Sequence, residues 1–190
     1  MKLRFPSAGD ARARVLALGA APARARRLQH DVILDTLDRR LLASGTTLRV
    51  RADGERAFLT FKGPIVPGVV KAREEIETEA ASAEALLAIG AALGYQPAFR
   101  YEKYREEFTV PGVVIAVDDT PIGVFVEIEG DEPTIHALAA RLGFSSADYV
   151  TASYQSLFLA SALAGDGARD MIFPVAPVAP GPPVLPDPRP

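Results

Sequence analysis

Hydrophobic and polar residues alternate with a period of two along several short segments of the chain. This alternation predicts β-strands, because successive side chains of a strand point to opposite faces of a sheet. Most of these segments follow one another through short connections, which favours antiparallel pairing. We therefore expect about eight strands in one antiparallel sheet, at residues 2–5, 27–35, 46–51, 56–62, 70–79, 99–110, 113–118 and 123–130.

A helical spacing of apolar residues occurs at four places between and after these strands, and the combination indicates an α+β fold. Ser82 is placed to cap the start of one helix, and Gly94 is placed to end it. Asp53 and Gly54 form a turn signal between two strands and predict a β-hairpin. The expected helices span residues 10–18, 82–93, 132–142 and 149–162.

The end of the chain differs in composition from the rest. Residues 164–190 contain eight of the sixteen prolines. Proline cannot donate a backbone hydrogen bond and favours extended conformations. We therefore expect one folded domain at residues 1–163, followed by a disordered proline-rich tail at 164–190.

Composition excludes several classes of function. The chain has no cysteine, which rules out disulfides and thiol catalysis, and its two histidines, His30 and His136, are too far apart in sequence to suggest a histidine metal site. A formal net charge of -3 argues against nucleic-acid binding driven by bulk charge. No apolar run approaches the roughly 20 residues that span a bilayer, and the N-terminus lacks the apolar stretch of a signal peptide. We expect a cytoplasmic protein without membrane or nucleic-acid partners.

Charged residues occupy one face of nearly every expected strand. Taken one strand at a time, a solvated outer face explains this pattern; six or more such faces together could instead line the interior of a barrel. Lysine and arginine suit polyphosphate oxygens, and paired carboxylates suit Mg²⁺ or Mn²⁺. A barrel of about eight strands is wide enough for side chains and one small ligand. The shared faces hold Lys2 with Arg4, Arg49 with Arg51, Thr60 with Lys62, Arg73 with Glu75, Glu77 and Glu79, Lys103 with Arg105 and Glu107, and Glu127 with Glu129.

Five segments in this order resemble the CYTH superfamily, which is named for class IV adenylate cyclases and thiamine triphosphatases. The resemblance runs from Lys2 to about Ala160 and implies a closed antiparallel eight-stranded barrel, a triphosphate tunnel, with flanking helices. The matching segments are LRVR at 48–51, LTFKGP at 59–64, AREEIETE at 72–79, EKYREEF at 102–108 and DDTPIGVFVEIEG at 118–130.

The resemblance also implies a role for individual residues. Lys2 matches the lysine of the family's N-terminal Glu-x-Glu-x-Lys signature and would help to activate the attacking water. The two glutamates of that signature would precede Met1, so we expect either a natural start upstream or weakened metal binding. The phosphate-binding residues would be Arg4, Arg49, Arg51, Lys62, Arg73, Lys103 and Arg105. The residues that hold or orient Mg²⁺ or Mn²⁺ would be Glu75, Glu77, Asp118, Glu127 and Glu129.

Several functions fit these residues. The leading hypothesis is metal-dependent hydrolysis of tripolyphosphate or of an organic triphosphate such as thiamine triphosphate. The alternative is a class IV adenylate cyclase that converts ATP to cyclic AMP and pyrophosphate. A second alternative is a module that binds polyphosphate or nucleotide without turnover, whereas a carrier of apolar ligands would need an apolar lining. We expect a monomer or a homodimer whose partner is a small-molecule triphosphate.

Overall fold

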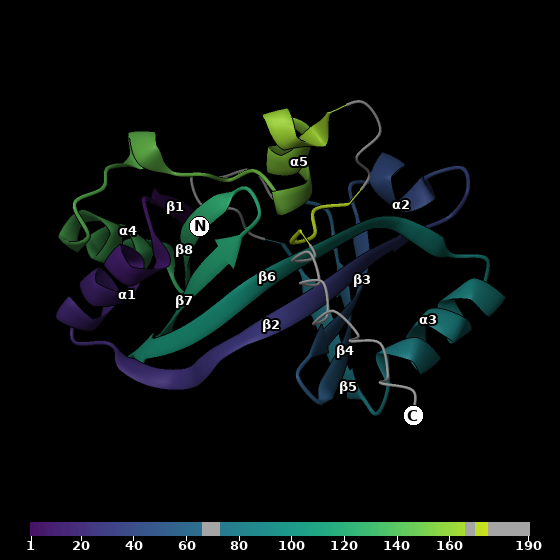
Figure 1. Ribbon diagram of the computed structural model, residues 1–190, viewed down its shortest axis with the longest axis horizontal. Helices are drawn as coiled ribbons and strands as arrows, with labels where there is room; N and C mark the ends of the chain where they lie inside the picture. Colours follow the sequence, from purple (N-terminus) through teal and green to yellow (C-terminus); the bar gives the residue numbers. More distant parts are fainter. Residues whose placement is uncertain (66–72, 166–169, 175–190) are drawn as a thin grey trace, which may run out of the picture.

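A computed structural model describes residues 1–65, 73–165 and 170–174 and shows an α+β fold built on one eight-stranded sheet (Figure 1). The strands pair antiparallel in the order β1-β8-β7-β6-β2-β3-β4-β5, which confirms the antiparallel sheet that the alternation predicts. The strands are β1 (Lys2–Phe5), β2 (Ala21–Asp35), β3 (Thr47–Asp53), β4 (Arg56–Lys62), β5 (Glu75–Ala80), β6 (Gln96–Val110), β7 (Val113–Thr120) and β8 (Gly123–Glu129).

Helices flank the sheet. The Ser82 hydroxyl accepts a hydrogen bond from the Ala85 N–H and caps the third of them, as the sequence predicts. None of the helices in the described ranges combines the length and the hydropathy that crossing a bilayer requires. The helices are α1 (Ala8–Ala17), α2 (Arg40–Ala43), α3 (Ala83–Ala92), α4 (Glu132–Arg141) and α5 (Tyr154–Leu159), with 3₁₀ turns at Ser146–Asp148 and Ala162–Ala164.

The structure departs from the expected elements in three places. The helix predicted at 149–162 begins only at Tyr154, because Ser153 caps it and Val150 pairs with β1 instead. The short helix α2 was not predicted; the Asp35 carboxylate stabilises its start by accepting from two of its backbone N–H groups. The strand predicted at 70–79 begins at Glu75, and residues 66–72 lie outside the described part of the chain.

The closed barrel expected from the resemblance is wrong: the sheet is curled but not closed. Within the described residues, no pairing joins β1 to β5: β1 pairs with β8 and, at Lys2, with Val150, and β5 pairs with β4. A cavity of about 440 Å³ lies between these two edges, and it is lined from one side by Lys2 and Glu129 and from the other by Arg73 and Glu75. In a closed barrel, backbone hydrogen bonds would join β1 to β5. Here charged side chains lie between these two strands, and β1 is only four residues long.

The larger hydrophobic core lies on the outer face of the sheet. Figure 1 shows α1 and α4 beside β1, β7 and β8 at one end of the molecule. Val15 of α1 and Ile135 of α4 are fully buried against this face. Alternation along β8 sends Val126 and Ile128 into this core and leaves Glu127 on the inner face. The helices thus anchor the strands whose opposite faces carry the charged residues.

A smaller hydrophobic cluster lies where α5 packs against β6 and β8. Phe99 and Tyr101 of β6 contact Tyr154 and Phe158 of α5, with ring centroids about 6 Å apart. Met171 belongs to the same cluster and is fully buried. This cluster fixes α5, and with it Tyr154, over one end of the inner face.

The prediction that the chain from residue 164 onward is disordered is wrong for residues 170–174. Met171 pairs parallel with Tyr101, donating its N–H to the Arg100 carbonyl and accepting from the Glu102 N–H, both at 2.9 Å. β7 pairs with β6 only from Tyr104 onward, so this stretch of β6 has a free edge on that side. Pro174 lies within the described residues, and the other seven prolines of the predicted tail lie in residues 175–190, outside the described part of the chain.

We predict that Met171→Ala lowers the free energy of unfolding by about 2 kcal/mol or more, because it leaves a cavity in a fully buried cluster. Ile172→Ala is the matched control: Ile172 is 50% exposed, so its truncation should change stability by about 0.5 kcal/mol at most. Denaturant unfolding of the full chain measures both values. Equal effects of the two substitutions would show that residues 170–174 do not pack as described.

Candidate functional site

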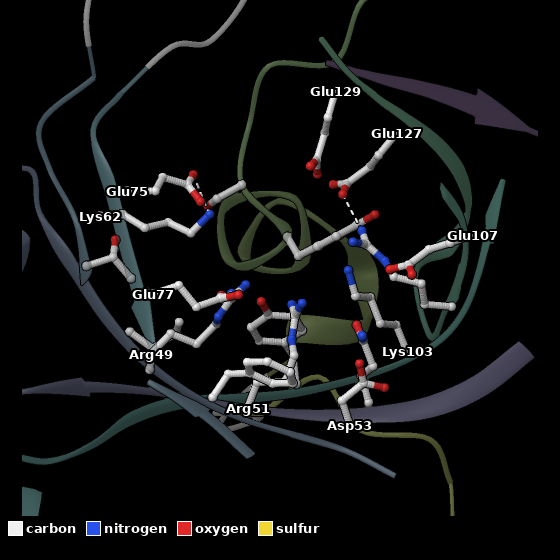
Figure 2. A pocket seen from close by; sticks show the side chains of 18 of the residues that line it. Arg49, Arg51, Asp53, Lys62, Glu75, Glu77, Lys103, Glu107, Glu127 and Glu129 are labelled. Carbon is white, nitrogen blue, oxygen red and sulfur yellow. Dashed lines mark hydrogen bonds and ion pairs between the residues drawn. The ribbon is translucent and has the colours of Figure 1, made fainter. Parts of the chain in front are cut away.

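A cavity of about 340 Å³ lies inside the curl of the sheet, and we call it the phosphate cavity in view of its charged lining. Figure 2 shows side chains from β3, β4, β5, β6 and β8 converging on this space. The predicted site residues that line it are Lys2, Arg49, Arg51, Lys62, Glu75, Glu77, Lys103, Arg105, Glu127 and Glu129. The period-two alternation therefore brings residues from six strands to one interior.

Asp118 organises two of the cations in the cavity wall. It lies opposite Arg105 in the register of β6 and β7, and it is completely buried. Its carboxylate accepts two hydrogen bonds from Arg105, both at 2.6 Å, and one from Lys103 Nζ at 2.8 Å. The Tyr154 hydroxyl donates a fourth, also at 2.8 Å. Oδ2 thus accepts three of these hydrogen bonds and Oδ1 accepts one.

Burial and mutual repulsion control the charges of this group. Burial, together with the neighbouring Arg105 charge, lowers the pKa of Lys103 to about 8. Burial alone would raise the pKa of Asp118, but the charges of Arg105 and Lys103 outweigh it and hold that pKa below its ordinary value. Asp118 is therefore ionised at neutral pH, and Lys103 loses its proton at a lower pH than an ordinary lysine does.

Lys2 and Glu127 form a second pair at one side of the cavity. They lie opposite each other in the register of β1 and β8, with Lys2 Nζ 3.4 Å from Glu127 Oε1. Glu127 also contacts the Arg105 guanidinium. Burial opposes ionisation of Glu127, but the charges of Lys2 and Arg105 hold its pKa well below the ordinary value. Lys2 Nζ also lies 5.0 Å from the centre of the Tyr154 ring, over its face.

Asp31 of β2 plays the same part for the other two arginines. It is 1% exposed, and it accepts a hydrogen bond of 2.9 Å from Arg51 Nε, while Arg49 Nε lies 3.4 Å away. The Arg49 guanidinium also donates to the Thr60 hydroxyl at 2.9 Å and to Glu77 at 3.3 Å. Burial would raise the pKa of Asp31, but the Arg51 and Arg49 charges lower it. Two buried carboxylates, on the strands that flank β6, thus hold four cations.

Lys62, Arg73 and Glu75 lie together near the open edge of the sheet, and Lys62 and Glu75 line the cavity there. Lys62 Nζ donates to Glu75 Oε1 at 2.5 Å, and Arg73 Nε lies 3.9 Å from the same oxygen. Burial and the Arg49 charge lower the pKa of Lys62. Arg73 lines the adjoining cavity between β1 and β5 and is not among the residues that line the phosphate cavity itself.

The far end of the cavity carries a further ionic group that the sequence did not reveal. Asp53 is 3% exposed and accepts from Arg27 Nε at 2.5 Å, while Arg24 lies 2.9 Å away. Glu107 pairs with Arg27 at 3.0 Å, and Gln29 lines the same end of the cavity. This group pairs its charges internally, in contrast to the surplus of cations around Lys103.

The carboxylates fit a metal ion that is shared with a ligand. Among the described residues, no three carboxylate or imidazole groups come together in a ready-made metal site. Mg²⁺ typically takes one or two carboxylates and completes its shell with water and substrate phosphates. Glu127 and Glu129 stand two residues apart on β8 and face the same space (Figure 2), and Glu129 makes no ion pair within the described residues. This donor set suits a hard cation bridging to a phosphate.

Besides Arg73, two predicted residues are absent from the lining of the cavity. Arg4 stacks on the Phe125 ring at 4.7 Å and donates to the Ile122 carbonyl, so the structure does not bring it to the other cations. Asp118 lies behind Lys103 and Arg105 and does not line the cavity. Its position indicates that it orients these two side chains.

Sequence reasoning missed Asp31, Asp53 and Tyr154 as residues of the site. Tyr154 does pack in the aromatic cluster, yet its hydroxyl also reaches Asp118. One signal for Asp31 existed: it is a single carboxylate within an otherwise apolar stretch, DVIL, of a strand. A buried acid there requires a cationic partner, which the neighbouring strand supplies.

Comparisons with known proteins agree with this geometry. The CYTH domain family profile matches residues 1–154. A protein of Methanocaldococcus jannaschii, named as a candidate adenylate cyclase, is 30% identical over 105 residues, which are 55% of this chain and 60% of that relative. The chain thus spans about 60% of the length of this curated relative.

Solved structures share the fold. A candidate adenylate cyclase from Vibrio parahaemolyticus superposes with a TM-score of 0.72 at 22% identity, over 83% of this chain and 95% of that one. A candidate adenylyl cyclase from Hippeastrum, described as having a dominant triphosphatase activity, gives a TM-score of 0.66 at 19% identity, over 84% and 94%. At these identities the likeness establishes the architecture alone.

We predict that Lys103 titrates near pH 8, against 10.5 for an ordinary lysine. Between these values the unfolded chain binds the proton and the folded chain does not, so the free energy of unfolding contributed by this group increases as the pH rises through that window. Side-chain NMR of the lysine Cε and Nζ nuclei measures the midpoint, and loss of the signal in Lys103→Arg assigns it. A midpoint near 10 would mean that Lys103 is not buried among the other cations.

Proposed function

The chain belongs to the CYTH domain family, and from this membership we propose that it is a divalent-metal-dependent enzyme that hydrolyses a triphosphate. The observation that carries the proposal is the phosphate cavity, into which Arg49, Arg51, Lys103 and Arg105 project together with the Glu127 carboxylate. Its volume of about 340 Å³ suits a small ligand. Tripolyphosphate and organic triphosphates such as thiamine triphosphate are the proposed substrates.

In this proposal Arg49, Arg51, Lys103 and Arg105 bind the phosphate oxygens. Asp31 and Asp118 hold their side chains in place before any ligand arrives, so little reorganisation is needed when negative charge develops on the leaving phosphates. For Asp118 we propose this positioning role in place of the metal ligation expected from the resemblance. Lys62 and Arg73 extend the basic surface toward the open edge of the sheet.

Glu127 and Glu129 would hold Mg²⁺ or Mn²⁺, with Glu75 and Glu77 on the facing wall of the cavity. The metal, when bound, would supply charge that neutralises the phosphate oxygens. These glutamates need a bound cation, because their negative charges would otherwise repel the phosphates of the substrate. Glu129 is the clearest candidate, since it has no competing cation within the described residues.

Lys2 is the proposed catalytic residue. Its ammonium lines both the phosphate cavity and the adjoining cavity at the edge of the sheet, where water can approach the end of a bound triphosphate. In hydrolysis a water oxygen attacks the terminal phosphorus, the bond to the bridging oxygen breaks, and the remaining phosphate chain leaves with that electron pair. The Ala152 carbonyl accepts from Lys2 Nζ at 3.1 Å and, with Glu127, directs the ammonium toward this position.

Adenylate cyclase activity is the second candidate, and the names of the relatives from Methanocaldococcus jannaschii and Vibrio parahaemolyticus favour it. In that reaction the ribose 3′-hydroxyl of ATP attacks the α-phosphorus, and pyrophosphate leaves. The same cavity serves both reactions, because each places a triphosphate chain against the same cations. The Hippeastrum protein has a dominant triphosphatase activity, which supports our ranking of hydrolysis above cyclisation. Oligomeric state and cytoplasmic location stay predictions.

We predict that the chain releases orthophosphate from tripolyphosphate, thiamine triphosphate or ATP when Mg²⁺ or Mn²⁺ is supplied, and that chelation stops the reaction. Product analysis by phosphate assay and ion-exchange chromatography tests this, with Arg105→Ala as the inactive control. Cyclic AMP and pyrophosphate from ATP would instead establish the cyclase. Binding of these compounds without any product would instead support the second alternative, a module that binds polyphosphate or nucleotide without turnover.

We predict that Glu129→Gln raises the Mg²⁺ concentration needed for half-maximal tripolyphosphate hydrolysis by about tenfold or more. The change removes one carboxylate charge without leaving a cation unpaired in the described structure, so stability should be retained. Glu79→Gln is the matched control, because Glu79 pairs with Arg56 and does not line the cavity. An unchanged metal requirement in Glu129→Gln would remove this residue from the metal site.

A further inference from the structure

Tyr154 lies where the last α-helix meets the phosphate cavity. It is the first residue of α5, it is buried, and its side chain lines the cavity. Two other rings contact its ring: Tyr101 of β6 at 6.1 Å between centroids, and Phe125 of β8, edge to face, at 5.5 Å. Met171 belongs to the same buried cluster. The ring of Tyr154 is therefore held from several sides and has little freedom to move.

The hydroxyl of Tyr154 belongs to the group of charges around Asp118. It donates to Asp118 Oδ2 at 2.8 Å, and the same oxygen accepts from Lys103 Nζ and from the Arg105 guanidinium. Burial, with the charges of Asp118 and Glu127, raises the pKa of Tyr154 well above its ordinary value. The phenol therefore keeps its proton, and remains a donor, over the pH range in which Lys103 titrates.

The ring of Tyr154 meets two ammonium groups from different strands. Lys2 Nζ of β1 lies over the ring at 5.0 Å from its centre, and Lys103 Nζ of β6 lies over it at 5.2 Å. Both distances are within the range at which a cation is attracted to the face of a ring. Both lysines line the phosphate cavity, and Figure 2 shows Lys103 pointing into it. β8 and β7 separate β1 from β6 in the sheet, so backbone pairing does not join these two lysines directly.

We propose that Tyr154 is a positioning residue of the active site, which holds the ammonium groups of Lys2 and Lys103 in fixed places along the bound triphosphate. The inference rests on the proposed function, in which Lys2 assists the attack of water and Lys103 binds phosphate oxygens. A lysine side chain is long and flexible. Fixing its ammonium before the substrate arrives removes part of the entropic cost of reaching the transition state.

Packing alone does not account for a tyrosine at this position. Phe99, Phe125 and Phe158 fill the same cluster without a polar group. A buried hydroxyl needs a hydrogen-bond partner, and the hydroxyl of Tyr154 finds it in the carboxylate of Asp118. The side chain thus contacts apolar rings on one side and offers a hydroxyl and a ring face to the charged residues of the cavity.

NMR of the lysine side chains tests these contacts without any substrate. Protons that lie over an aromatic ring resonate upfield, so we expect upfield shifts for the Cε protons of Lys2 and Lys103 in the unmodified full chain. Lys2→Arg and Lys103→Arg assign the two signals by removing them. Tyr154→Phe should keep both shifts, because the ring remains, and Tyr154→Leu should abolish them. Ordinary lysine positions for both signals in the unmodified chain would overturn the inference, whether or not the leucine variant folds.

Kinetics test the role of Tyr154 in the reaction. We expect Tyr154→Leu to lower kcat for tripolyphosphate hydrolysis with Mg²⁺ by about tenfold or more, because a small displacement of a catalytic group slows a reaction strongly. Tyr154→Phe should recover most of this loss. Phe108→Leu is the matched control, since Phe108 is fully buried in the larger core and does not line the phosphate cavity. It should lower stability and leave kcat unchanged.

The outcomes separate this inference from the proposed function. Equal kcat values in Tyr154→Leu and Phe108→Leu would overturn the positioning role, while hydrolysis by the unmodified chain would leave the triphosphatase standing. An unmodified chain that hydrolyses none of the proposed substrates would refute the proposed function, and with it the role of Tyr154 in the reaction, whatever the NMR shifts.

Discussion

The structure depends on mutual repulsion among cations that face one another inside the sheet. Arg49, Arg51, Lys103 and Arg105 all reach the same interior, where water screens their charges poorly. Asp31 and Asp118 make this arrangement tolerable, since each buried carboxylate contacts a cation pair. Burial, together with the neighbouring Arg105 charge, still lowers the pKa of Lys103 to about 8.

Strand register converts this electrostatic requirement into a requirement on the fold. Directly opposite residues form the decisive pairs: Asp31 with Arg51, Lys62 with Glu75, Arg105 with Asp118 and Lys2 with Glu127. A shift of one residue between any two strands would turn one partner to the outer face and strand the other in the interior. The apolar outer faces add the same constraint from the other side, because α1 and α4 need them in this register. Packing and ion pairing therefore specify one alignment.

Alternation in the sequence was enough to predict the antiparallel strands and the inward direction of residues such as Arg49 and Lys103. It did not identify Asp31 as a site residue, because the role of this carboxylate depends on the arginines of the strand beside it. Nor could it predict the packing of Met171, which depends on an unpaired stretch of β6 that only the assembled sheet exposes. The closed barrel failed for a related reason: strand number was inferred correctly, whereas the pairing of the first and last strands is a property of the whole sheet.

The pairing of β1 with β8 also has a consequence for the order in which the chain assembles. Lys2 is synthesised well before its partners Glu127 and the Ala152 carbonyl, which follow it in the chain by up to 150 residues. Contacts this distant along the chain slow folding, since long loops must be closed before they form. A nascent chain therefore carries an unfinished, highly charged inner surface for most of its synthesis. Because this inner surface is hydrophilic, a delay in completing it exposes charged side chains to water and does not promote aggregation. Slow assembly of the sheet is therefore tolerable in a crowded cell.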